Sequence, residues 1–237
     1  MKYLRDKLSV MGESLAGLFF PRLCPACSGV LYGNESILCL KCNCEFPRTG
    51  FHLDPANDTA RLFWGRVMIK NAASFFFYQK GSRFQNIIHK VKYHNCRHLG
   101  MEMGRWYGHE LVNTPFCHAD LIHPVPLHVR KQRKRGYNQS ELIAKGLSES
   151  LSLPMETGLV ERVMYTDTQT RKSKYERWSN VEGIFRVIHP EKLKNKHVLL
   201  VDDVVTTGST LEACAAPILS VEGTQVSILT LAYAKLW

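Results

Sequence analysis

The chain has 237 residues, of which 45% are hydrophobic and 22% are charged, a balance typical of a folded protein rather than a disordered one. Its formal net charge is +10, which favours an anionic partner such as a nucleotide, a pyrophosphate or a nucleic acid. No run of about 18 apolar residues occurs, so the sequence predicts no membrane span. Because residues 1–20 lack the apolar core and cleavage site of a signal peptide, we expect a cytoplasmic protein.

The chain divides into three regions. Residues 1–50 hold an amphipathic helical pattern over residues 1–20 and then a cluster of cysteines, which together predict an N-terminal helix and a metal-binding module. Residues 51–112 form a connecting, hood-like region with a predicted strand and a predicted helix. Residues 113–237 alternate short apolar runs with helical segments, which predicts βαβ units and a mainly parallel sheet, an α/β fold.

The predicted elements after residue 50 follow from the spacing of apolar residues. Strands are indicated by runs of β-branched and aromatic residues, and helices by apolar positions three and four residues apart. The predicted strands cover residues 67–78, 119–125, 158–165, 197–201 and 226–234, and the predicted helices cover residues 83–111, 140–150 and 210–221.

Two pairs of cysteines predict a metal site near the N-terminus. Cys24 and Cys27 form one C-x2-C pair, Cys39 and Cys42 form a second, and eleven residues separate the two pairs. Each pair directs two thiolates at one point, and two pairs complete the tetrahedral ligand set of Zn²⁺. Four protein ligands leave no open position, so we expect a structural ion. Cys44 remains an alternative to Cys42 as the fourth ligand, at a spacing that matches the first pair less well.

The segment from residue 197 to residue 211 predicts a site for a phosphorylated sugar. A buried strand is followed by Asp202 and Asp203 and then by the sequence T-T-G-S-T, which opens a helix. A loop of small hydroxyl residues at a helix start presents backbone N–H groups to an anion. Acidic residues do not suit a phosphate, but they suit the vicinal hydroxyls of a sugar. The simpler alternative is a capped strand-to-helix turn with solvated aspartates.

A second informative segment is basic. Five of the six residues from Arg130 to Arg135 are Lys or Arg, directly after the strand predicted over residues 119–125. Alone, such a run indicates a solvated face or a nucleic-acid patch. Next to a sugar phosphate site it also suits a pyrophosphate, which Arg binds through bidentate contacts. A long polar segment over residues 166–185 is a further candidate, because long loops in compact domains usually serve function.

Together these segments resemble type I phosphoribosyltransferases and, more closely, the ComF family, which includes the ComFC and GntX-like competence proteins. The resemblance covers nearly the whole chain, including the cysteines. It implies a type I phosphoribosyltransferase fold over residues 113–237, preceded by a small four-cysteine zinc module. One departure is the Arg-Lys pair after Gln169-Thr170, where a more apolar continuation is expected. The segments that carry the resemblance are V-D-D-V-V-T-T-G-S-T, R-G-Y-N-Q at residues 135–139, Lys92-Tyr93, and Gln169-Thr170 with Arg177 and Asn180.

The resemblance implies that the ligand is 5-phosphoribosyl-1-pyrophosphate (PRPP), bound with Mg²⁺. Asp202 and Asp203 would then hold the ribose hydroxyls. The 5′-phosphate would be held by Thr206, Thr207, Gly208, Ser209 and Thr210. The pyrophosphate would be held by Arg133, Arg135 and Gln139 and by a mobile loop that contains Arg171, Lys172 and Lys174.

Three functions remain open from the sequence. The resemblance implies a PRPP-binding protein that acts in DNA uptake during natural transformation, beside a competence helicase that handles single-stranded DNA. The alternatives are an active phosphoribosyltransferase of nucleobase or nucleotide salvage, and a single-stranded DNA-binding module without turnover. The sequence identifies no catalytic residue and no acceptor substrate, and it leaves the oligomeric state open.

Overall fold

The computed structural model of the chain describes residues 21–93, 96–163 and 183–235. The helix predicted over residues 1–20 lies outside these ranges, and so does most of the polar segment over residues 166–185, with Arg171, Lys172 and Lys174. Among the helices of the described ranges, none combines the length and the apolar character that a membrane crossing requires.

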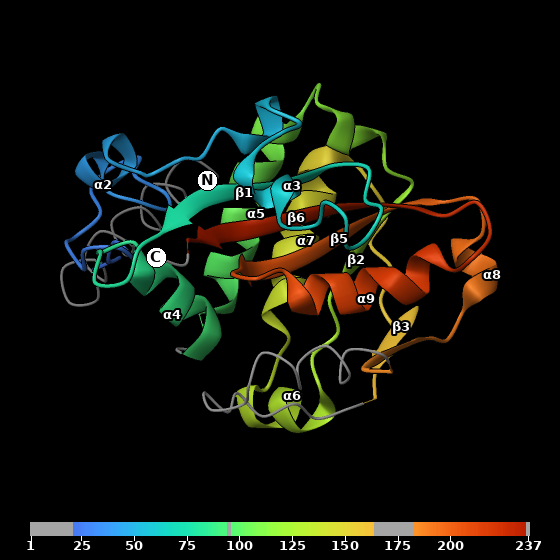
Figure 1. The fold of residues 1–237 in the computed structure, drawn as a ribbon. Helices are drawn as coiled ribbons and strands as arrows, with labels where there is room; N and C mark the ends of the chain where they lie inside the picture. Colours follow the sequence, from blue (N-terminus) through green and yellow to red (C-terminus); the bar gives the residue numbers. More distant parts are fainter. Residues whose placement is uncertain (1–20, 94–95, 164–182, 236–237) are drawn as a thin grey trace, which may run out of the picture.

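The centre of the molecule is a four-stranded sheet in the order β1-β6-β5-β2, and each neighbouring pair is parallel (Figure 1). The prediction of a mainly parallel α/β fold is therefore confirmed. These strands read as nearly continuous apolar runs because both faces of the sheet are buried. The strands are β1 (Ala72–Tyr78), β2 (Leu121–Pro124), β5 (His197–Val205) and β6 (Gln225–Ala234).

Strand β5 is longer than predicted. The apolar run stops at Val201, but the pairing with β6 continues from Asp202, opposite Thr230, to Val205, opposite Tyr233. Backbone pairing does not require apolar side chains, so a strand can run on through polar residues whose side chains find partners. The two aspartates therefore belong to the strand itself, and the loop begins after Val205.

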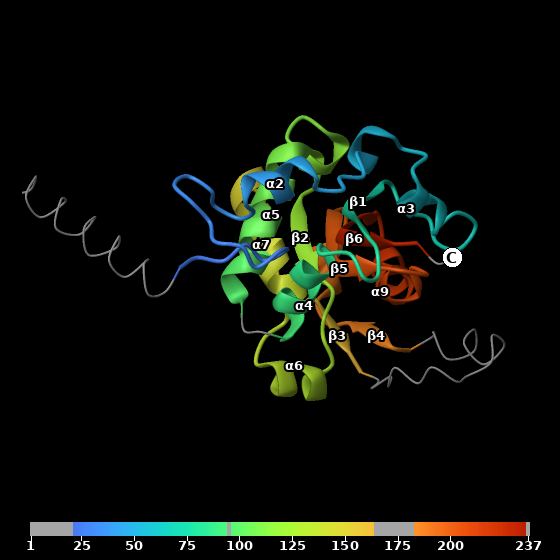
Figure 2. The ribbon, with the colours of Figure 1, turned by 90° about the vertical axis from the view of Figure 1, so that its left-hand side faces the viewer.

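Helices cover both faces of the sheet. Helices α5 (Arg97–Leu111) and α7 (Gln139–Leu151) lie on one side and α9 (Ser209–Leu219) lies on the other (Figure 2). Helix α4 (Gln85–Tyr93) precedes α5, so the single helical stretch predicted over residues 83–111 is two helices. In the α5–α7 contact, a Cβ added at Gly146 would come within 2.0 Å of the Met101 carbonyl oxygen. Glycine therefore allows these two helices to touch through their backbones.

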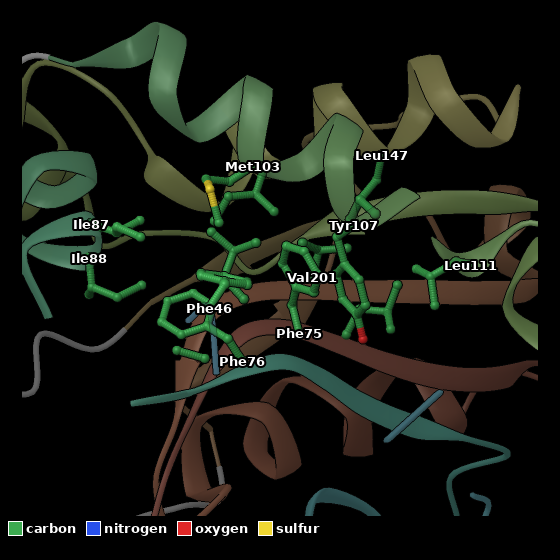
Figure 3. Packing of buried hydrophobic residues seen from close by; sticks show 14 of the residues in the cluster. Phe46, Phe75, Phe76, Ile87, Ile88, Met103, Tyr107, Leu111, Leu147 and Val201 are labelled. Atoms are coloured by element: carbon green, nitrogen blue, oxygen red, sulfur yellow. The ribbon is translucent and has the colours of Figure 1, made fainter. Parts of the chain in front are cut away.

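Aromatic residues fill the core between the sheet and α5 (Figure 3). Tyr107 of α5 stacks on Phe75 of β1, with ring centroids 4.7 Å apart and planes 11° apart. Phe46, which follows the cysteine cluster, packs against Phe75, Phe76 and Trp106. The cysteine module therefore shares its core with the sheet.

Short elements complete the structure. The strand predicted over residues 158–165 is shortened to β3, which pairs with β4 in a separate antiparallel hairpin. Only its first residue, Val160, is buried, so it lacks the apolar character of the main sheet. These elements are α2 (Leu40–Cys44), η1 (Phe51–Leu53), α3 (Asp58–Arg61), η2 (Pro115–His118), α6 (Val129–Arg135), β3 (Val160–Arg162), β4 (Phe185–Val187) and α8 (Pro190–Leu193).

Candidate functional site

A pocket lies where β5 passes into α9. It is lined by Asp202 and by residues 204–211, so the acidic strand end and the T-T-G-S-T loop border the same cavity. Gly208 is the N-cap residue of α9 and has a φ of 77°. Glycine has no side chain to cap the helix, and the Ser209 N–H makes only a long hydrogen bond of 3.5 Å to the Thr207 hydroxyl, so the N–H groups at the start of α9 can bind an anion. The hydroxyl oxygens of Thr207 and Ser209 lie 3.0 Å apart and add donors at the same loop.

A distant segment of the chain supports this loop from behind. A Cβ added at Gly208 would come within 3.0 Å of the Phe63 ring, so only glycine fits there without displacement. Arg66 donates from Nη1 to the Thr207 carbonyl oxygen at 2.8 Å and forms an ion pair with Glu212 of α9. The roles of Phe63 and Arg66 could not be predicted from the sequence, because no local pattern links them to a loop some 140 positions later.

The two aspartates of β5 have different surroundings. Asp202 lines the pocket, and its Oδ1 accepts hydrogen bonds from the Ser140 hydroxyl at 2.8 Å and from the Asp203 backbone N–H at 2.9 Å. Burial, together with the charge of Asp203, raises the pKa of Asp202 to about 6. The Asp203 side chain is only 6% exposed, and its Oδ2 lies 3.0 Å from the Lys92 ammonium.

Lys92 comes from the end of α4 and is largely buried. Burial disfavours its charged form, but the adjacent Asp203 carboxylate outweighs that effect, so the pKa of Lys92 is raised. The positive charge of Arg135 also acts on Lys92, in the opposite direction. The Tyr137 hydroxyl donates to the Val91 carbonyl oxygen at 2.7 Å, which fixes the backbone next to Lys92.

The R-G-Y-N-Q segment joins α6 to α7 and delivers Ser140 to the acidic pair. Gly136 ends α6 with a φ of 77°. The Asn138 side chain accepts a hydrogen bond from the Ser140 N–H at 3.1 Å and donates one to the Val125 carbonyl oxygen at 3.1 Å. It therefore caps α7 and ties this helix to the end of β2. Ser140 directly follows the motif, and this position was the only sequence signal for its role.

The residues predicted for the pyrophosphate are only partly brought together. Arg135 donates from Nη1 to the Gln139 side-chain oxygen at 2.9 Å, so these two lie side by side near Lys92. Arg133 is exposed on α6. Arg162 of β3 was not predicted, but its guanidinium interacts with Asp202. Burial lowers the pKa of Arg162, although Asp202 opposes that shift.

The cysteine cluster forms a second candidate site. The sulfur atoms of Cys24, Cys27, Cys39 and Cys42 all lie within 4.8 Å of one another. Those of Cys27 and Cys39 are 3.7 Å apart, close to the edge of about 3.8 Å that a Zn²⁺–S tetrahedron requires. Cys44 is exposed and lies outside this group, so the converging fourth thiol is Cys42.

The four thiols differ in how readily they ionise: the pKa values of Cys39 and Cys42 are raised, for Cys42 by burial and by the neighbouring thiols, whereas that of Cys24 is lowered. Burial opposes ionisation of Cys24, but backbone N–H groups of Cys27, Cys39 and Ala26 lower the pKa of its thiol to about 7. Hydrogen bonds from backbone amides stabilise thiolates, the form that ligates metals. The four cysteines can therefore hold a metal ion such as zinc.

Helix α4 connects the two sites. The Asn86 side-chain amide, near the start of α4, donates to the Ala26 carbonyl oxygen of the cysteine module at 2.8 Å. Lys92, near its end, pairs with Asp203. One short helix therefore contacts the cysteine module with its first turn and, with its last, Asp203, the neighbour of the pocket-lining Asp202.

Comparison with known proteins identifies a family domain over the pocket. The phosphoribosyl transferase domain family matches residues 138–235, a range that contains Ser140, β5, the T-T-G-S-T loop and β6. Among solved structures, glutamine PRPP amidotransferase from Bacillus subtilis aligns with 60% of this chain and 30% of its own, with 18% identity and a TM-score of 0.42.

Curated relatives match parts of the chain. Competence protein F of Haemophilus influenzae is 41% identical over 93 residues, which cover 39% of this chain and 41% of that protein. DNA utilization protein YhgH of Escherichia coli K12 is 33% identical over 133 residues, 54% of this chain and 58% of that protein. Competence protein ComFC of Bacillus subtilis is 33% identical over 101 residues, 43% of this chain and 38% of that protein. The chain thus spans about half the length of the curated relatives it matches.

Proposed function

Because the chain belongs to the ComF family, we propose that it binds PRPP at the carboxyl end of β5 and acts in the handling of DNA taken up by the cell. One observation carries the PRPP part of this proposal: Asp202 and the T-T-G-S-T loop line one pocket. An acceptor for hydroxyls and a cradle for an anion, side by side, match the two ends of a ribose 5-phosphate.

In this proposal the 5′-phosphate rests on residues 206–210, on the N–H groups at the start of α9 and the adjacent hydroxyls. Asp202, which lines the pocket, accepts hydrogen bonds from the ribose hydroxyls. Asp203 is the second member of the acidic pair and lies outside the pocket lining. Mg²⁺ accompanies PRPP and is held mainly by the ligand, because this ion keeps waters and takes few protein ligands.

The pyrophosphate is assigned to the basic residues that follow β2. Arg135 and Gln139, which bond to each other beside Lys92, form the described part of this subsite, and Arg133 contributes from the exposed side of α6. We assign Arg171, Lys172 and Lys174, which lie outside the described residues, to the same subsite.

The metal of the cysteine module is proposed to be structural Zn²⁺. Four thiols leave no coordination position for a substrate or water, so the ion would contribute folding energy and no reaction step.

The DNA part of the proposal rests on the relatives, two of which are named for competence and one for DNA utilization. Single-stranded DNA and a competence helicase are the proposed partners. The basic residues of α6 are the proposed contact, since phosphate charge dominates the affinity of proteins for nucleic acids. Two alternatives can be told apart from this proposal. An active transferase of nucleobase or nucleotide salvage would release pyrophosphate from PRPP, and a DNA-binding module without turnover would not bind PRPP.

Calorimetric titration of the purified protein with PRPP at saturating Mg²⁺ tests the ligand. We expect binding by the wild type, at least about a tenfold loss in Asp202→Asn because an ionised hydroxyl acceptor disappears, and no change in the control Asp58→Asn. Asp58 is an aspartate on α3 that pairs with Arg61 away from the pocket lining. Absence of binding by the wild type would refute the proposal.

Two further assays separate the three functions. Incubation with PRPP, Mg²⁺ and a panel of bases should leave pyrophosphate unreleased unless the protein is an active transferase. Titration of labelled single-stranded DNA against salt should show weaker binding in Arg133→Ala with a shallower salt dependence. A deletion strain that transforms normally would contradict the role in DNA uptake.

A further inference from the structure

We propose that Lys92 recognises the pyrophosphate group of PRPP and that Asp203 serves to position Lys92 rather than to hold a ribose hydroxyl. This inference rests on the proposed function and divides the acidic pair into two separate tasks. Asp202 would bind the ribose hydroxyls, and Lys92, held by Asp203, would bind the pyrophosphate on C1.

The exposure of the two aspartates supports this division. Asp202 lines the pocket, whereas Asp203 is absent from the residues that line it in the described structure. The Asp203 carboxylate is 6% exposed and already has the Lys92 ammonium 3.0 Å away, while the Lys92 side chain is 23% exposed. Lys92 is also absent from that lining, but its ammonium is the more exposed partner, so a ligand that extends from the pocket to this pair meets the ammonium before the carboxylate.

The chemistry of an ammonium suits this task. Lys carries three N–H donors, and one acceptor oxygen on Asp203 does not use them all. Asp203 also keeps Lys92 charged, because a buried ammonium without a carboxylate partner would lose its proton more readily. Asp203 therefore fixes the position and the protonation of the Lys92 ammonium inside a partly buried site, where the attraction of this ammonium to a phosphate oxygen is stronger than in water.

The neighbours of Lys92 point to the pyrophosphate rather than to the 5′-phosphate. Lys92 interacts electrostatically with both Asp202 and Arg135, so it lies close to the proposed hydroxyl acceptor and to the proposed pyrophosphate subsite. In PRPP the pyrophosphate on C1 projects from the same side of the ribose ring as the two hydroxyls. A cation beside the hydroxyl acceptor is therefore next to the pyrophosphate, while the 5′-phosphate lies on the loop at the other end of the pocket.

The proposal makes Lys92 the residue that distinguishes PRPP from ribose 5-phosphate. Calorimetry with both ligands on wild type, Lys92→Met, Asp202→Asn and Asp203→Asn measures this directly. We expect Lys92→Met to weaken PRPP binding by about 10- to 100-fold, the usual size of a lost hydrogen bond to a charged group, and to change ribose 5-phosphate binding by less than about threefold. Asp202→Asn should weaken both ligands.

Two further variants keep the test decisive. Lys92→Met leaves a buried carboxylate unpaired, so the double variant Lys92→Met/Asp203→Asn removes both charges and preserves folding. If Asp203 acts only through Lys92, the double variant should bind PRPP within about twofold of Lys92→Met. The matched control is Lys90→Met, which removes the same charge from a half-buried position of α4 that has no ion pair with Asp203, and it should bind both ligands normally.

Three outcomes would overturn the inference. Asp203→Asn could weaken ribose 5-phosphate as strongly as Asp202→Asn does, which would make Asp203 a hydroxyl ligand. The double variant could lose both ligands equally, which would give Lys92 a structural role alone. If the wild type binds neither ligand, the proposed function fails together with this inference.

Discussion

The cysteine module and the proposed PRPP pocket are built in opposite ways. The module takes its four ligands from a short stretch of chain between Cys24 and Cys42. The pocket combines a loop after β5 with supports from segments far away in the sequence, among them Arg66, Lys92 and Ser140. One site is thus encoded locally and the other only by the fold.

This difference decides what stabilises each site. With the proposed Zn²⁺ bound, the module would take its ordering energy from the ion, whereas the pocket depends on ion pairs, hydrogen bonds and helix packing between distant elements. The two sites are nevertheless joined, because α4 contacts Ala26 through Asn86 and Asp203 through Lys92. Changes in one region should therefore reach the other through this helix.

The largest effect is expected from loss of the metal. Cys42→Ser removes one ligand from a set whose ion contributes on the order of 10–16 kcal/mol in small zinc modules. The buried residues of the module belong to the same cluster as Phe75 and Phe76 of β1, so we expect a lower Tm of the whole protein and weaker PRPP binding. Metal content, thermal unfolding and calorimetry measure these three effects.

Cys44→Ser is the matched control, since Cys44 is exposed and lies outside the group of converging thiols. We expect it to retain the metal and the Tm of the wild type. If Cys42→Ser and Cys44→Ser behaved alike, the module would not be a metal site. If Cys42→Ser lowered the Tm but left PRPP binding unchanged, the two regions would be independent.

The next largest effect is expected from a change in the contact between α5 and α7, which positions Ser140 next to the pocket. Gly146→Ala would place a Cβ 2.0 Å from the Met101 carbonyl oxygen and 2.7 Å from the Arg105 nitrogen, so α5 and α7 must separate. We expect a loss of about 3 kcal/mol in the free energy of unfolding, measured by denaturant titration. PRPP binding should weaken too, because α7 presents Ser140 to Asp202.

Lys145→Ala, at an exposed position of the same helix, should leave both stability and binding nearly unchanged. A Gly146→Ala protein as stable as this control would show that the close approach of the two helices does not matter for the fold.

The sequence predicted what is local and missed what is not. The C-x2-C pairs, the order of strands and helices and the T-T-G-S-T loop follow from spacing and residue type, which act over a few positions. The supports of the pocket do not: Phe63 and Arg66 show their role only when the fold places them behind Gly208. The end of β5 was also misplaced, because polar side chains interrupted an apolar run while backbone pairing continued.

The distinction between Asp202 and Asp203 was likewise invisible in the sequence. Two adjacent identical residues give one pattern, and the sequence assigned both to the same hydroxyls. Their difference arises from partners on other elements, Ser140 on α7 and Lys92 on α4. Such partners follow from tertiary packing and not from local propensity.

The smallest expected effect is a pH dependence of PRPP binding. The pKa of Asp202 is raised to about 6, so its carboxyl is protonated below that pH and becomes a full hydroxyl acceptor above it. PRPP affinity should therefore rise with pH by about tenfold per unit up to about 6 and then level off. The stability that this raised pKa contributes has the opposite sign, since it is present at low pH and is lost as the pH rises through about 6.

The phosphate groups of PRPP titrate in a similar range, so the profile needs the Asp202→Asn variant as its reference. The ratio of the wild-type affinity to the Asp202→Asn affinity should then change with pH only through the ionisation of Asp202. Ser140→Ala should shift the transition to higher pH, because the Ser140 hydrogen bond lowers the pKa of Asp202. A ratio that is flat from pH 5 to pH 8 would contradict the assignment of Asp202 as the hydroxyl acceptor.

The most direct test of the central claim is a crystal structure of the protein soaked with PRPP and Mg²⁺. The account predicts density for the 5′-phosphate on the backbone N–H groups of residues 206–210, the ribose hydroxyls on Asp202 and the pyrophosphate beside Lys92. A 5′-phosphate bound elsewhere, for example on the basic residues of α6, with the pocket at the end of β5 empty, would contradict it.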